Sequence, residues 1–366
     1  MFNKPKVAIV YLVWSDEPQK YLQLALRGVA EQTYSKENLE LLIVYNSHKK
    51  EEPSAAPFIR RCVDLYANVL PHTTILEQEE NLGFAGGNNV GMQWAIENKF
   101  DYVFLNNADG FLHSDAIEKL VSVMEADKSV GQIQPLILLY PEQDLINSAG
   151  NAWHYLGMGY CNLERKPVAE YKFPATQEID YASGAATMFR TDLLTRYGAW
   201  KEEFFLYHED TEYSLRLRFL GYKIVMAGNA IFYHQYDFER SITKLYWMER
   251  NRHVLKLLFY KWPTLFLLLP LEVVYNFGLL ITALRGGWIK EILKVYTYWA
   301  NPLNWIKWLK YRNEIQKTRK ITDGELLEHT VLTVDSGEEF VGRPMHRLAN
   351  TIFTIYGSLL KILVKW

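Results

Sequence analysis

Cysteine is scarce in this 366-residue chain: Cys62 and Cys161 are the only two, and they lie far apart in the sequence. Two distant cysteines provide neither a disulfide framework nor a cysteine-rich zinc site, so the sequence favours a reducing, cytoplasmic setting. Internal repeats and low-complexity tracts are also missing. With 49% hydrophobic and 22% charged residues, the composition is that of a globular protein and not of a disordered one.

A signal peptide and a dinucleotide fingerprint are missing near the N-terminus. Residues 7–14 are apolar and follow Lys4 and Lys6, but the run is short and continues without a small-residue cleavage site. We predict that this run is the first buried strand of a parallel sheet. The glycine fingerprint of dehydrogenases does not follow it, because Trp14-Ser15-Asp16 stands there, and this argues against a Rossmann dehydrogenase.

The net charge of −2 hides a split between two regions. Residues 1–239 hold 21 Lys/Arg and 32 Asp/Glu, a net charge of −11, whereas residues 240–320 hold 15 Lys/Arg and four acids, a net charge of +11. The basic stretch also contains Trp247, Trp262, Trp288, Trp299, Trp305 and Trp308. Basic residues interleaved with tryptophan suit lipid headgroups or a nucleic acid. Since no nucleic-acid motif accompanies them, we expect a membrane surface and no nucleic acid.

Strand and helix patterns alternate in the first two thirds of the chain. Apolar, β-branched runs predict strands at 7–13, 41–45, 73–77, 101–105, 130–139 and 222–233, and the more mixed pattern that begins at Ile179 predicts a further strand before residue 191. Helical spacing predicts helices at 21–32, 85–98, 114–126 (capped by Ser114), 191–197 and 210–220. Such alternation indicates an α/β domain with a parallel sheet. A composition shift near Glu239 places this domain at residues 1–240 and a helical, basic appendage at 241–366.

The first polar cluster, Asn106 to Gly110, follows the apolar strand pattern directly. In open α/β sheets ligands bind at the carboxyl ends of strands. Asp109 could hold a hard divalent cation that also binds diphosphate oxygens and offsets charge on a departing nucleotide. An ordinary Asn/Asp/Gly turn is the alternative.

The second cluster, Gly83 to Gly91, enters a helix. Glycines let backbone N–H groups approach a phosphate or ribose, and a helix N-terminus favours an anion. A tight loop with small packing residues is the alternative.

The third cluster surrounds Asp210, at the start of a predicted helix. Backbone donors and the helix dipole stabilise an ionised carboxylate there, and such a carboxylate can act as a general base. An N-cap aspartate without catalytic role is the alternative. His234 closes the next strand, where a structural histidine is a common finding.

Together these clusters resemble the family-2 glycosyltransferases, in particular the rhamnosyltransferase-like enzymes of bacterial surface polysaccharide assembly. The ordered motifs are Gln32-Thr33-Tyr34, Gly83 to Gly91, Leu105 to Gly110, Ser183-Gly184-Ala185-Ala186, His208-Glu209-Asp210 and Tyr233-His234. The resemblance covers roughly residues 5–260 and implies a GT-A fold, a nucleotide-sugar donor, Mg²⁺ or Mn²⁺ as cofactor, and inversion of the anomeric carbon.

By position, the resemblance implies a role for each of several residues. Asp210 matches the catalytic base, and Asp109 and His234 match the metal and diphosphate ligands, with Asn107 at the first position of the family's D-x-D motif. The other positions expected to line the donor and acceptor sites are Val13, Tyr45, Gly83, Asn88, Asn89, Ser183, Gly184 and Glu209.

Two departures from the family pattern bear on the donor. Tyr45 replaces the aspartate that usually reads the base, which leaves uracil and thymine open, and Asn107 is a weaker ligand than a carboxylate. The Q-x-x-R-W signature of processive synthases is missing, so we expect transfer of a single sugar to a glycan or polyprenyl-diphosphate-linked acceptor. A catalytically inactive, nucleotide-sugar-binding scaffold subunit is the alternative, and a homo-oligomer is left open.

Two apolar segments lie in the predicted appendage. Residues 263–284 have the length of a bilayer span but contain Pro263, Pro270, Glu272 and Asn276, so we expect an interfacial or re-entrant hairpin. Residues 345–366 place polar residues on one helical stripe and apolar residues opposite, which predicts a helix on the membrane surface. Helices packed on the protein's own core are the alternative for both. The expected location is therefore peripheral, on the inner face of the cell membrane.

Overall fold

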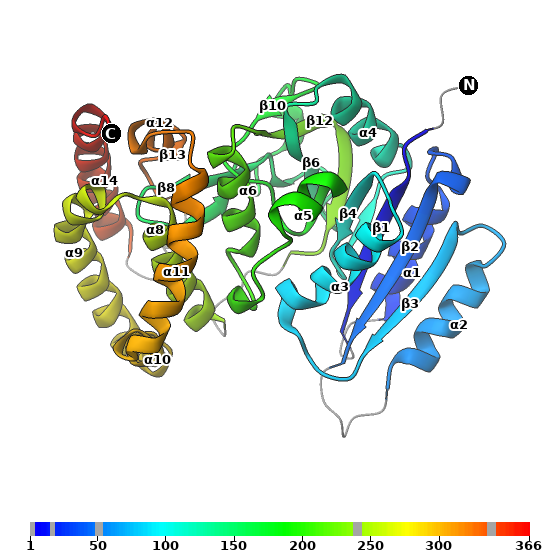
Figure 1. The fold of residues 1–366 in the computed structure, drawn as a ribbon, viewed down its shortest axis with the longest axis horizontal. Helices are drawn as coiled ribbons and strands as arrows, with labels where there is room; N and C mark the ends of the chain where they lie inside the picture. Colours follow the sequence, from blue (N-terminus) through cyan, green and yellow to red (C-terminus); the bar gives the residue numbers. More distant parts are fainter. Residues whose placement is uncertain (1–3, 15–18, 48–53, 237–243, 335–341) are drawn as a thin grey trace. The chain divides into compact units, whose positions relative to one another are not determined.

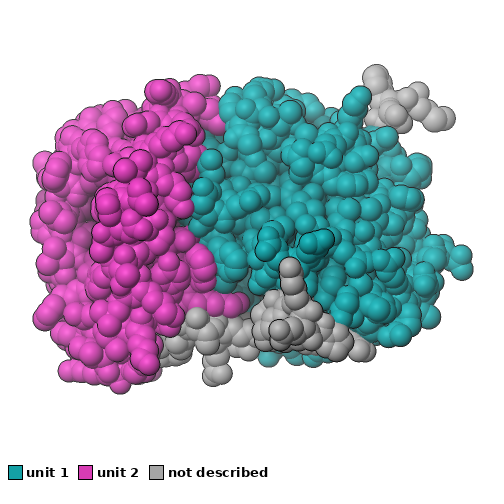
Figure 2. All heavy atoms as spheres, turned by 60° about the horizontal axis from the view of Figure 1, so that its bottom comes forward, with its two compact units in different colours: residues 1–151, 161–217, 222–236 teal, residues 152–160, 218–221, 237–366 magenta. Residues whose placement is uncertain are grey.

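The computed structural model describes residues 4–14, 19–47, 54–236, 244–334 and 342–366, in two compact units (Figure 2). The first unit comprises residues 1–151, 161–217 and 222–236, and the second comprises 152–160, 218–221 and 237–366. The sequence interpretation placed the boundary after residue 240 and assigned 152–160 and 218–221 to the first domain. Each unit is described below by itself.

A ten-stranded sheet forms the centre of the first unit (Figure 1). Its main path runs β10 (Gln177–Glu178), β12 (Lys223–His234), β6 (Val130–Leu139), β11 (Ala186–Arg190), β4 (Tyr102–Asn106), β1 (Val7–Val13), β2 (Leu39–Asn46) and β3 (His72–Gln78). Two short strands join beside this path: β5 (Gly110–Leu112) pairs with β12, and β7 (Ile146–Ser148) pairs with β6. The central strands are apolar on both faces because helices cover both sides.

The sheet is mixed: the predicted parallel pairing is confirmed for the first four strands, and an antiparallel strand follows. β1 to β4 pair in parallel, as do β6 and β12, but β11 runs antiparallel between β4 and β6. This antiparallel strand places the 183–185 segment, which precedes β11, beside the end of β4.

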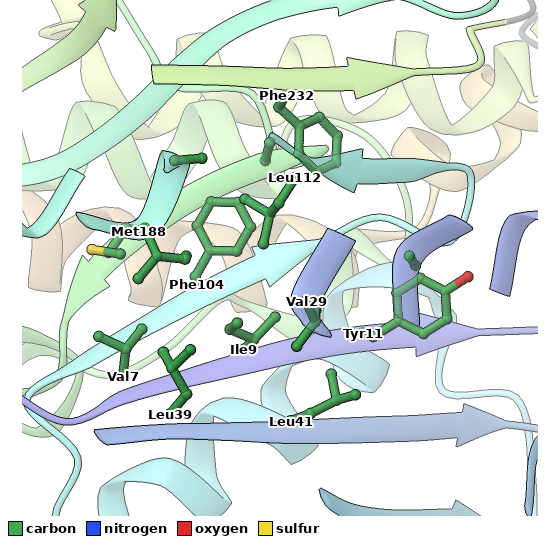
Figure 3. Packing of buried hydrophobic residues seen from close by; sticks show 14 of the residues in the cluster. Val7, Ile9, Tyr11, Val29, Leu39, Leu41, Phe104, Leu112, Met188 and Phe232 are labelled. Atoms are coloured by element: carbon green, nitrogen blue, oxygen red, sulfur yellow. The ribbon is translucent and has the colours of Figure 1, made fainter. Parts of the chain in front are cut away.

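The main core lies on one face of the sheet, under α1 (Gln19–Ala30), α2 (Ala56–Tyr66) and α4 (Ala116–Ala126). Alternate residues of β1 and β2 point into it, among them Val7, Ile9, Leu39 and Leu41 (Figure 3). The sequence prediction that Ser114 caps α4 is wrong: the N-cap is Asp115, and the Ser114 carbonyl accepts from the Thr33 N–H.

The opposite face of the sheet packs against α3 (Gly83–Glu97). A Cβ added at Gly87 would lie 2.6 Å from Leu12 Cδ1, and one at Gly91 would lie 2.4 Å from Val10 Cγ1. These two glycines, four residues apart on one face of the helix, therefore let α3 approach β1 closely. α5 (Thr191–Tyr197) lies next to α3, and α6 (Glu209–Phe219) begins in the same unit.

The second unit is mainly helical. Its helices are α8 (Leu245–Phe259), α9 (Trp262–Gly286), α10 (Ile289–Ala300), α11 (Pro302–Thr318), α12 (Asp323–Glu328) and α14 (Arg343–Leu363). A small sheet joins β13 (Thr330–Val331), β8 (Asn151–His154) and β9 (Gly159–Cys161). The expected hairpin at 263–284 is wrong, because α9 is one continuous helix with Pro270 inside it. The predicted C-terminal helix is confirmed.

Candidate active site

Two short strands bring the first predicted cluster to His234. β5 begins at Gly110, directly after Asp109, and pairs with the end of β12 so that His234 lies opposite Gly110. The His234 Nε2 atom consequently lies 3.0 Å from Asp109 Oδ1. The Asn107 amide nitrogen lies 2.7 Å from the same Oδ1 atom and 3.2 Å from Nε2. All three predicted metal-site residues therefore converge on one point.

Asn147, which no sequence pattern singled out, orients His234. The His234 Nδ1 atom lies 2.9 Å from the Asn147 Oδ1 atom, and both residues are buried. Since an amide oxygen only accepts, Nδ1 carries the hydrogen and Nε2 is left to face Asp109. Asn147 comes from the three-residue strand β7, which has no periodicity for a sequence argument to detect.

The arrangement of Asp109 and His234 fits a hard divalent cation. The 3.0 Å between Asp109 Oδ1 and His234 Nε2 is a direct hydrogen-bonding contact. The same separation is expected between neighbouring ligands that lie about 2.1 Å from an octahedral cation. The Asn107 amide donates toward both atoms, so a positive partial charge already lies between them. The described residues contain no group of three or more His, Cys, Asp and Glu side chains arranged so that they could hold a metal ion. Within this described part, no third carboxylate, imidazole or thiolate joins Asp109 and His234.

Asp210 is held as a hydrogen-bond acceptor at the start of α6. Its Oδ2 accepts from the Gly184 N–H at 2.9 Å, and its Oδ1 accepts from the Thr211 N–H at 2.6 Å and the Thr211 hydroxyl at 3.2 Å. Burial raises the pKa of Asp210, while these hydrogen bonds oppose the rise.

The neighbouring carboxyl, Glu209, has a different environment. Its side chain is 3% exposed, and its Oε2 atom has no hydrogen-bond partner among the described residues. Burial, and then repulsion from Asp210, raise the pKa of Glu209 well above its ordinary value. Because the two carboxyls differ in hydrogen bonding, Glu209 holds a proton more readily, and Asp210 is the one that ionises.

The backbone that leads into α6 is strained. Phe205, Tyr207 and His208 have φ angles of 61°, 66° and 69°, a region that non-glycine residues rarely occupy. The Phe205 carbonyl accepts from the N–H groups of Phe84 and Ala85, at 2.7 and 3.2 Å, at the start of α3. Strained backbone of this kind is often found at functional sites. Here the two hydrogen bonds to the Phe205 carbonyl connect the strained loop before Asp210 to the glycine-rich cluster.

The 183–185 segment connects the two chemical clusters. The Asn107 N–H donates to the Ala185 carbonyl at 2.9 Å, and the Gly184 N–H donates to Asp210. The Ser183 N–H donates to Gln134 Oε1, also at 2.9 Å. The candidate metal site and the candidate base therefore flank one short loop.

The glycine-rich cluster makes mostly internal contacts. Gly83 has a φ of +74°, and an added Cβ would clash with the ring and carbonyl of Phe205. Since the Phe84 and Ala85 N–H groups already donate to Phe205, they do not form an open anion site. Close packing of α3 on β1 explains the glycines at positions 87 and 91, which agrees with the alternative of a tight loop with small packing residues.

The asparagines of that cluster also bond within the protein. Asn88 is buried and donates to the Phe84 carbonyl at 2.9 Å. Asn89 donates to the Trp200 carbonyl at 2.8 Å and accepts from the Trp200 N–H at 3.1 Å. The structure thus does not bring these two side chains to Asp109 or Asp210, and a nucleoside contact stays a prediction.

Val13 is the last residue of β1 and pairs in register with Tyr45, the last residue but one of β2; both are buried in the main core. The Tyr45 hydroxyl accepts from the Ala55 N–H at 3.1 Å. The next residue, Asn46, is more informative: it accepts from the Leu82 N–H and donates to the Gly83 carbonyl, both at 3.0 Å. Asn46 therefore fixes the loop that starts α3, a role that sequence reasoning missed.

The mixed sheet and the polar groups at its strand ends define a GT-A type of nucleotide-sugar transferase fold. The sequence model described as "Glycosyltransferase like family 2" matches residues 5–255. Because this match covers well over half of the chain, the chain belongs to glycosyltransferase family 2.

Individual relatives are distant. The low-salt glycan biosynthesis hexosyltransferase Agl10 of Haloferax volcanii is 25% identical over 142 residues, which cover 38% of this chain and 44% of Agl10. The match thus spans less than half of that relative's length. GalNAc-T7 with UDP, GalNAc and Mn²⁺ superposes with a TM-score of 0.51 at 15% identity, covering 64% of this chain and 44% of that one. The mannosyltransferase PcManGT of Pyrobaculum calidifontis with GDP-Man and Mn²⁺ gives 0.48 at 14% identity, covering 99% and 88%.

Proposed function

We propose that this chain is an inverting, non-processive glycosyltransferase that moves one sugar from a nucleoside-diphosphate donor to a glycan or polyprenyl-diphosphate-linked acceptor. The observation that carries the proposal is the connection of two sites through residues 183–185. One site presents Asp210 as a hydrogen-bonded carboxylate, and the other presents Asp109 beside His234.

Asp210 would act as the general base. It takes the proton of an acceptor hydroxyl as that oxygen attacks the anomeric carbon of the donor sugar. The bond from this carbon to the diphosphate oxygen breaks, and the nucleoside diphosphate leaves with the bonding electrons. Because the hydroxyl attacks the face opposite the leaving group, the configuration inverts. The Gly184 and Thr211 hydrogen bonds fix the direction in which the carboxylate faces.

Asp109 and His234 would hold Mg²⁺ or Mn²⁺, with Asn107 beside them. The cation supplies positive charge that stabilises the departing diphosphate. By accepting from Nδ1–H, Asn147 would orient the His234 ring so that Nε2 is the nitrogen available to the cation, which is how hydrogen-bonded partners commonly position metal-ligating histidines.

The donor class follows from the family resemblance and not from a contact in this chain. UDP- and dTDP-linked sugars are the candidates, with rhamnose as one candidate sugar. The second function, an inactive scaffold subunit that only binds nucleotide sugar, is less well supported because both carboxylates of the site are in place. The expected setting is the cytoplasmic face of the cell membrane, where lipid-linked glycans are built.

A two-stage screen tests this function with the full chain. Nucleotide sugars are first tested for thermal stabilisation in Mg²⁺ or Mn²⁺, and the hits are then assayed for release of nucleoside diphosphate with and without acceptor. Metal-dependent stabilisation by one donor, followed by nucleotide release, supports the transferase. Stabilisation without any turnover across lipid-linked and soluble acceptors favours the scaffold, and no stabilisation by any nucleotide sugar refutes both.

A further inference from the structure

Exposed apolar side chains are concentrated in the second unit. Of the 22 large apolar side chains that are exposed in the described residues, 20 belong to this unit, and the other two are Leu65 and Val69. Isolated exposed apolar residues are normal, but contiguous ones mark an interaction surface. If these side chains form an interaction surface, it lies on the second unit.

α14 carries two separate apolar stripes. One stripe, Phe353, Gly357, Leu360 and the following Val364, is buried within the unit. The other recurs at alternating spacings of three and four and is at least 36% exposed throughout: Met345, Leu348, Ile352, Ile355, Leu359, Ile362 and Trp366. Two polar residues lie against the protein instead of facing water: Asn350 bonds the backbone of Val334, and Lys361 donates to the Thr330 carbonyl. The second stripe is therefore not needed for packing within the unit.

α9 presents a similar stripe and lies next to α14 (Figure 1). Its exposed apolar residues follow helical spacing and include Phe266, Leu269, Val273, Val274 and Phe277. The Trp366 Nε1–H donates to Thr264 Oγ1 at 3.0 Å, and the Tyr356 hydroxyl donates to the Leu267 carbonyl. The two exposed stripes thus belong to neighbouring helices.

The polar side of α9 is fixed to α8. Glu272 is 13% exposed and pairs with Arg252 at 3.0 Å and with Lys256. The Tyr275 hydroxyl lies 3.4 Å from Glu249 Oε1 on α8. α9 is long and apolar enough to cross a membrane: an 18-residue stretch of it has a mean hydropathy of 1.9, and only 17% of that stretch is buried. A crossing would, however, carry the ion-paired Glu272 into hydrocarbon, which is costly. The helix is better suited to lie along an interface.

The charges and aromatic residues around these stripes match an anionic lipid surface. The net charge of +11 over residues 240–320 lies in this unit, and exposed Trp262, Trp305 and Trp366 are amphipathic side chains typical of the headgroup region. A shallow pocket of the unit is lined by Tyr246, Lys290, Leu293, Lys294, Thr297, Tyr298, Asn301 and Asn304. Its ammonium, hydroxyl and amide groups suit phosphate oxygens, although Lys294 also pairs with Glu291 at 2.7 Å.

A second copy of the chain fits this surface less well. The 3–4 spacing along α14 resembles a coiled-coil seam, but residues 343–366 contain four Lys/Arg and no Asp or Glu. Two such helices have no opposite charges to pair across the seam and would repel each other. The charge pattern therefore favours lipid over self-association.

We propose that the exposed stripes of α9 and α14 form a docking surface that inserts into the interface of a bilayer containing anionic phospholipids. Insertion buries the two stripes to a depth of about 5–10 Å, as for other interfacial helices, while basic side chains meet the lipid phosphates. Docking would bring the enzyme to a lipid-linked acceptor, and this purpose rests on the proposed function. The docking surface itself does not depend on that function.

Co-sedimentation of the full chain with vesicles tests the surface. We expect the protein to pellet with phosphatidylcholine vesicles containing phosphatidylglycerol, and less with phosphatidylcholine alone. The double variant Phe277→Asp/Ile355→Asp should lower the partition coefficient at least tenfold, because two apolar contacts become charged. Leu65→Asp, at a still more exposed apolar position of the first unit, is the control and should bind like the wild type. Raising NaCl to 0.5 M should weaken binding only in part, since the apolar contact is not screened.

Hydrogen exchange of the unmodified chain provides a test that does not depend on the variant folding. Anionic vesicles should slow exchange in peptides from α9 and α14. The proposal is overturned if exchange in these peptides is unaffected by vesicles, or if Leu65→Asp loses as much vesicle binding as the double variant. It is also overturned if the wild type does not bind vesicles and instead forms a dimer that the double variant abolishes.

Docking and catalysis can fail independently. Asp210→Asn should bind vesicles normally even though it is inactive, whereas the double variant should still transfer sugar to a water-soluble acceptor. Loss of vesicle binding with intact transfer to that acceptor identifies a docking defect. Binding without any transfer by the wild type would refute the transferase and leave the docking surface standing.

Discussion

Replacing Asp210 with asparagine separates the role of its charge from the role of its shape. Removing a general base typically costs 10²–10⁴-fold in rate, so we expect kcat to fall by about 10²-fold or more, equivalent to about 2.7 kcal/mol of transition-state stabilisation. Donor binding should hardly change, since asparagine keeps the size and shape of the side chain at this position. Initial rates of nucleotide release and a donor titration measure the two effects separately.

The same variant should remain folded, because two effects on stability oppose each other. Asp210 accepts from the Gly184 N–H with one oxygen and from the Thr211 N–H with the other, and an asparagine can satisfy only one of these donors. That loss costs about 1 kcal/mol. Against it, the raised pKa means that the folded state binds the Asp210 proton more tightly than the unfolded state does. The ionised form therefore lowers stability at neutral pH, and the amide removes this penalty. We expect Tm to change by less than about 4 °C.

The pH dependence gives a further readout of Asp210. The base is active when ionised, so kcat should fall as pH falls through its raised pKa, at a higher pH than for an exposed aspartate. The residual rate of Asp210→Asn should lack this limb. Asp192→Asn, on the surface of α5 and paired with Arg196 at 3.1 Å, is the matched control and should behave as wild type. Near-normal turnover by Asp210→Asn, or the same acid limb in that variant, would refute the assignment.

Three further changes test other parts of the molecule. Asp109→Ala should abolish the metal-dependent stabilisation of the protein by the donor, as excess EDTA should in the wild type, whereas His234→Ala should reduce this stabilisation less. Calorimetric titration of metal and donor measures the effect, and full wild-type activity in EDTA would contradict a metal at this site. Gly91→Ala should lower the free energy of unfolding by about 1–3 kcal/mol, because the new Cβ would lie 2.4 Å from Val10. Gly278→Ala in α9, where a Cβ would meet no atom within 4 Å, should not lower Tm, and an equal loss of stability in both variants would refute the packing argument. Glu272→Gln should lower the free energy of unfolding, measured in urea, by about 3–5 kcal/mol, because buried Lys256 loses its carboxylate partner while Arg252 keeps only Glu249. The same change at Glu291, in its exposed pair with Lys294, should cost less than about 1 kcal/mol.

Elements with strong periodicity could be predicted from the sequence, but their direction could not. The runs at 7–13 and 130–139 are buried strands with the predicted bounds. β11 was not recognised as antiparallel, because a short apolar run has the same composition in either direction. The missed cap has a similar cause: Ser114 and Asp115 are both good N-cap residues, and only the backbone path decides between them.

The site could be predicted where a chemical group follows a strand, and not where a group acts through another. Asp109 and His234 stand at strand ends, and the structure brings them together. Asn147 and Asn46 are ordinary asparagines in the sequence, and their roles arise from partners more than 30 residues away. Likewise, two adjacent carboxyls at 209 and 210 look equivalent until burial and hydrogen bonding distinguish them.

The position of His234 depends on an irregularity in β12. Before the irregularity, the odd-numbered Val225 and Ala227 face the main core; after it, the even-numbered Ala230 and Phe232 do. The pairing with β6 passes directly from Ala227 to Ile231, so residues 228–230 form a bulge with an odd number of extra residues. Because side chains alternate along a strand, this odd number exchanges the two faces. His234 thereby continues the row of Ala230 and Phe232, whereas an uninterrupted strand would place the odd-numbered Tyr233 on that face. The bulge thus decides which side chain meets Asp109, and in the sequence only Gly228, inside the predicted strand 222–233, marks its place.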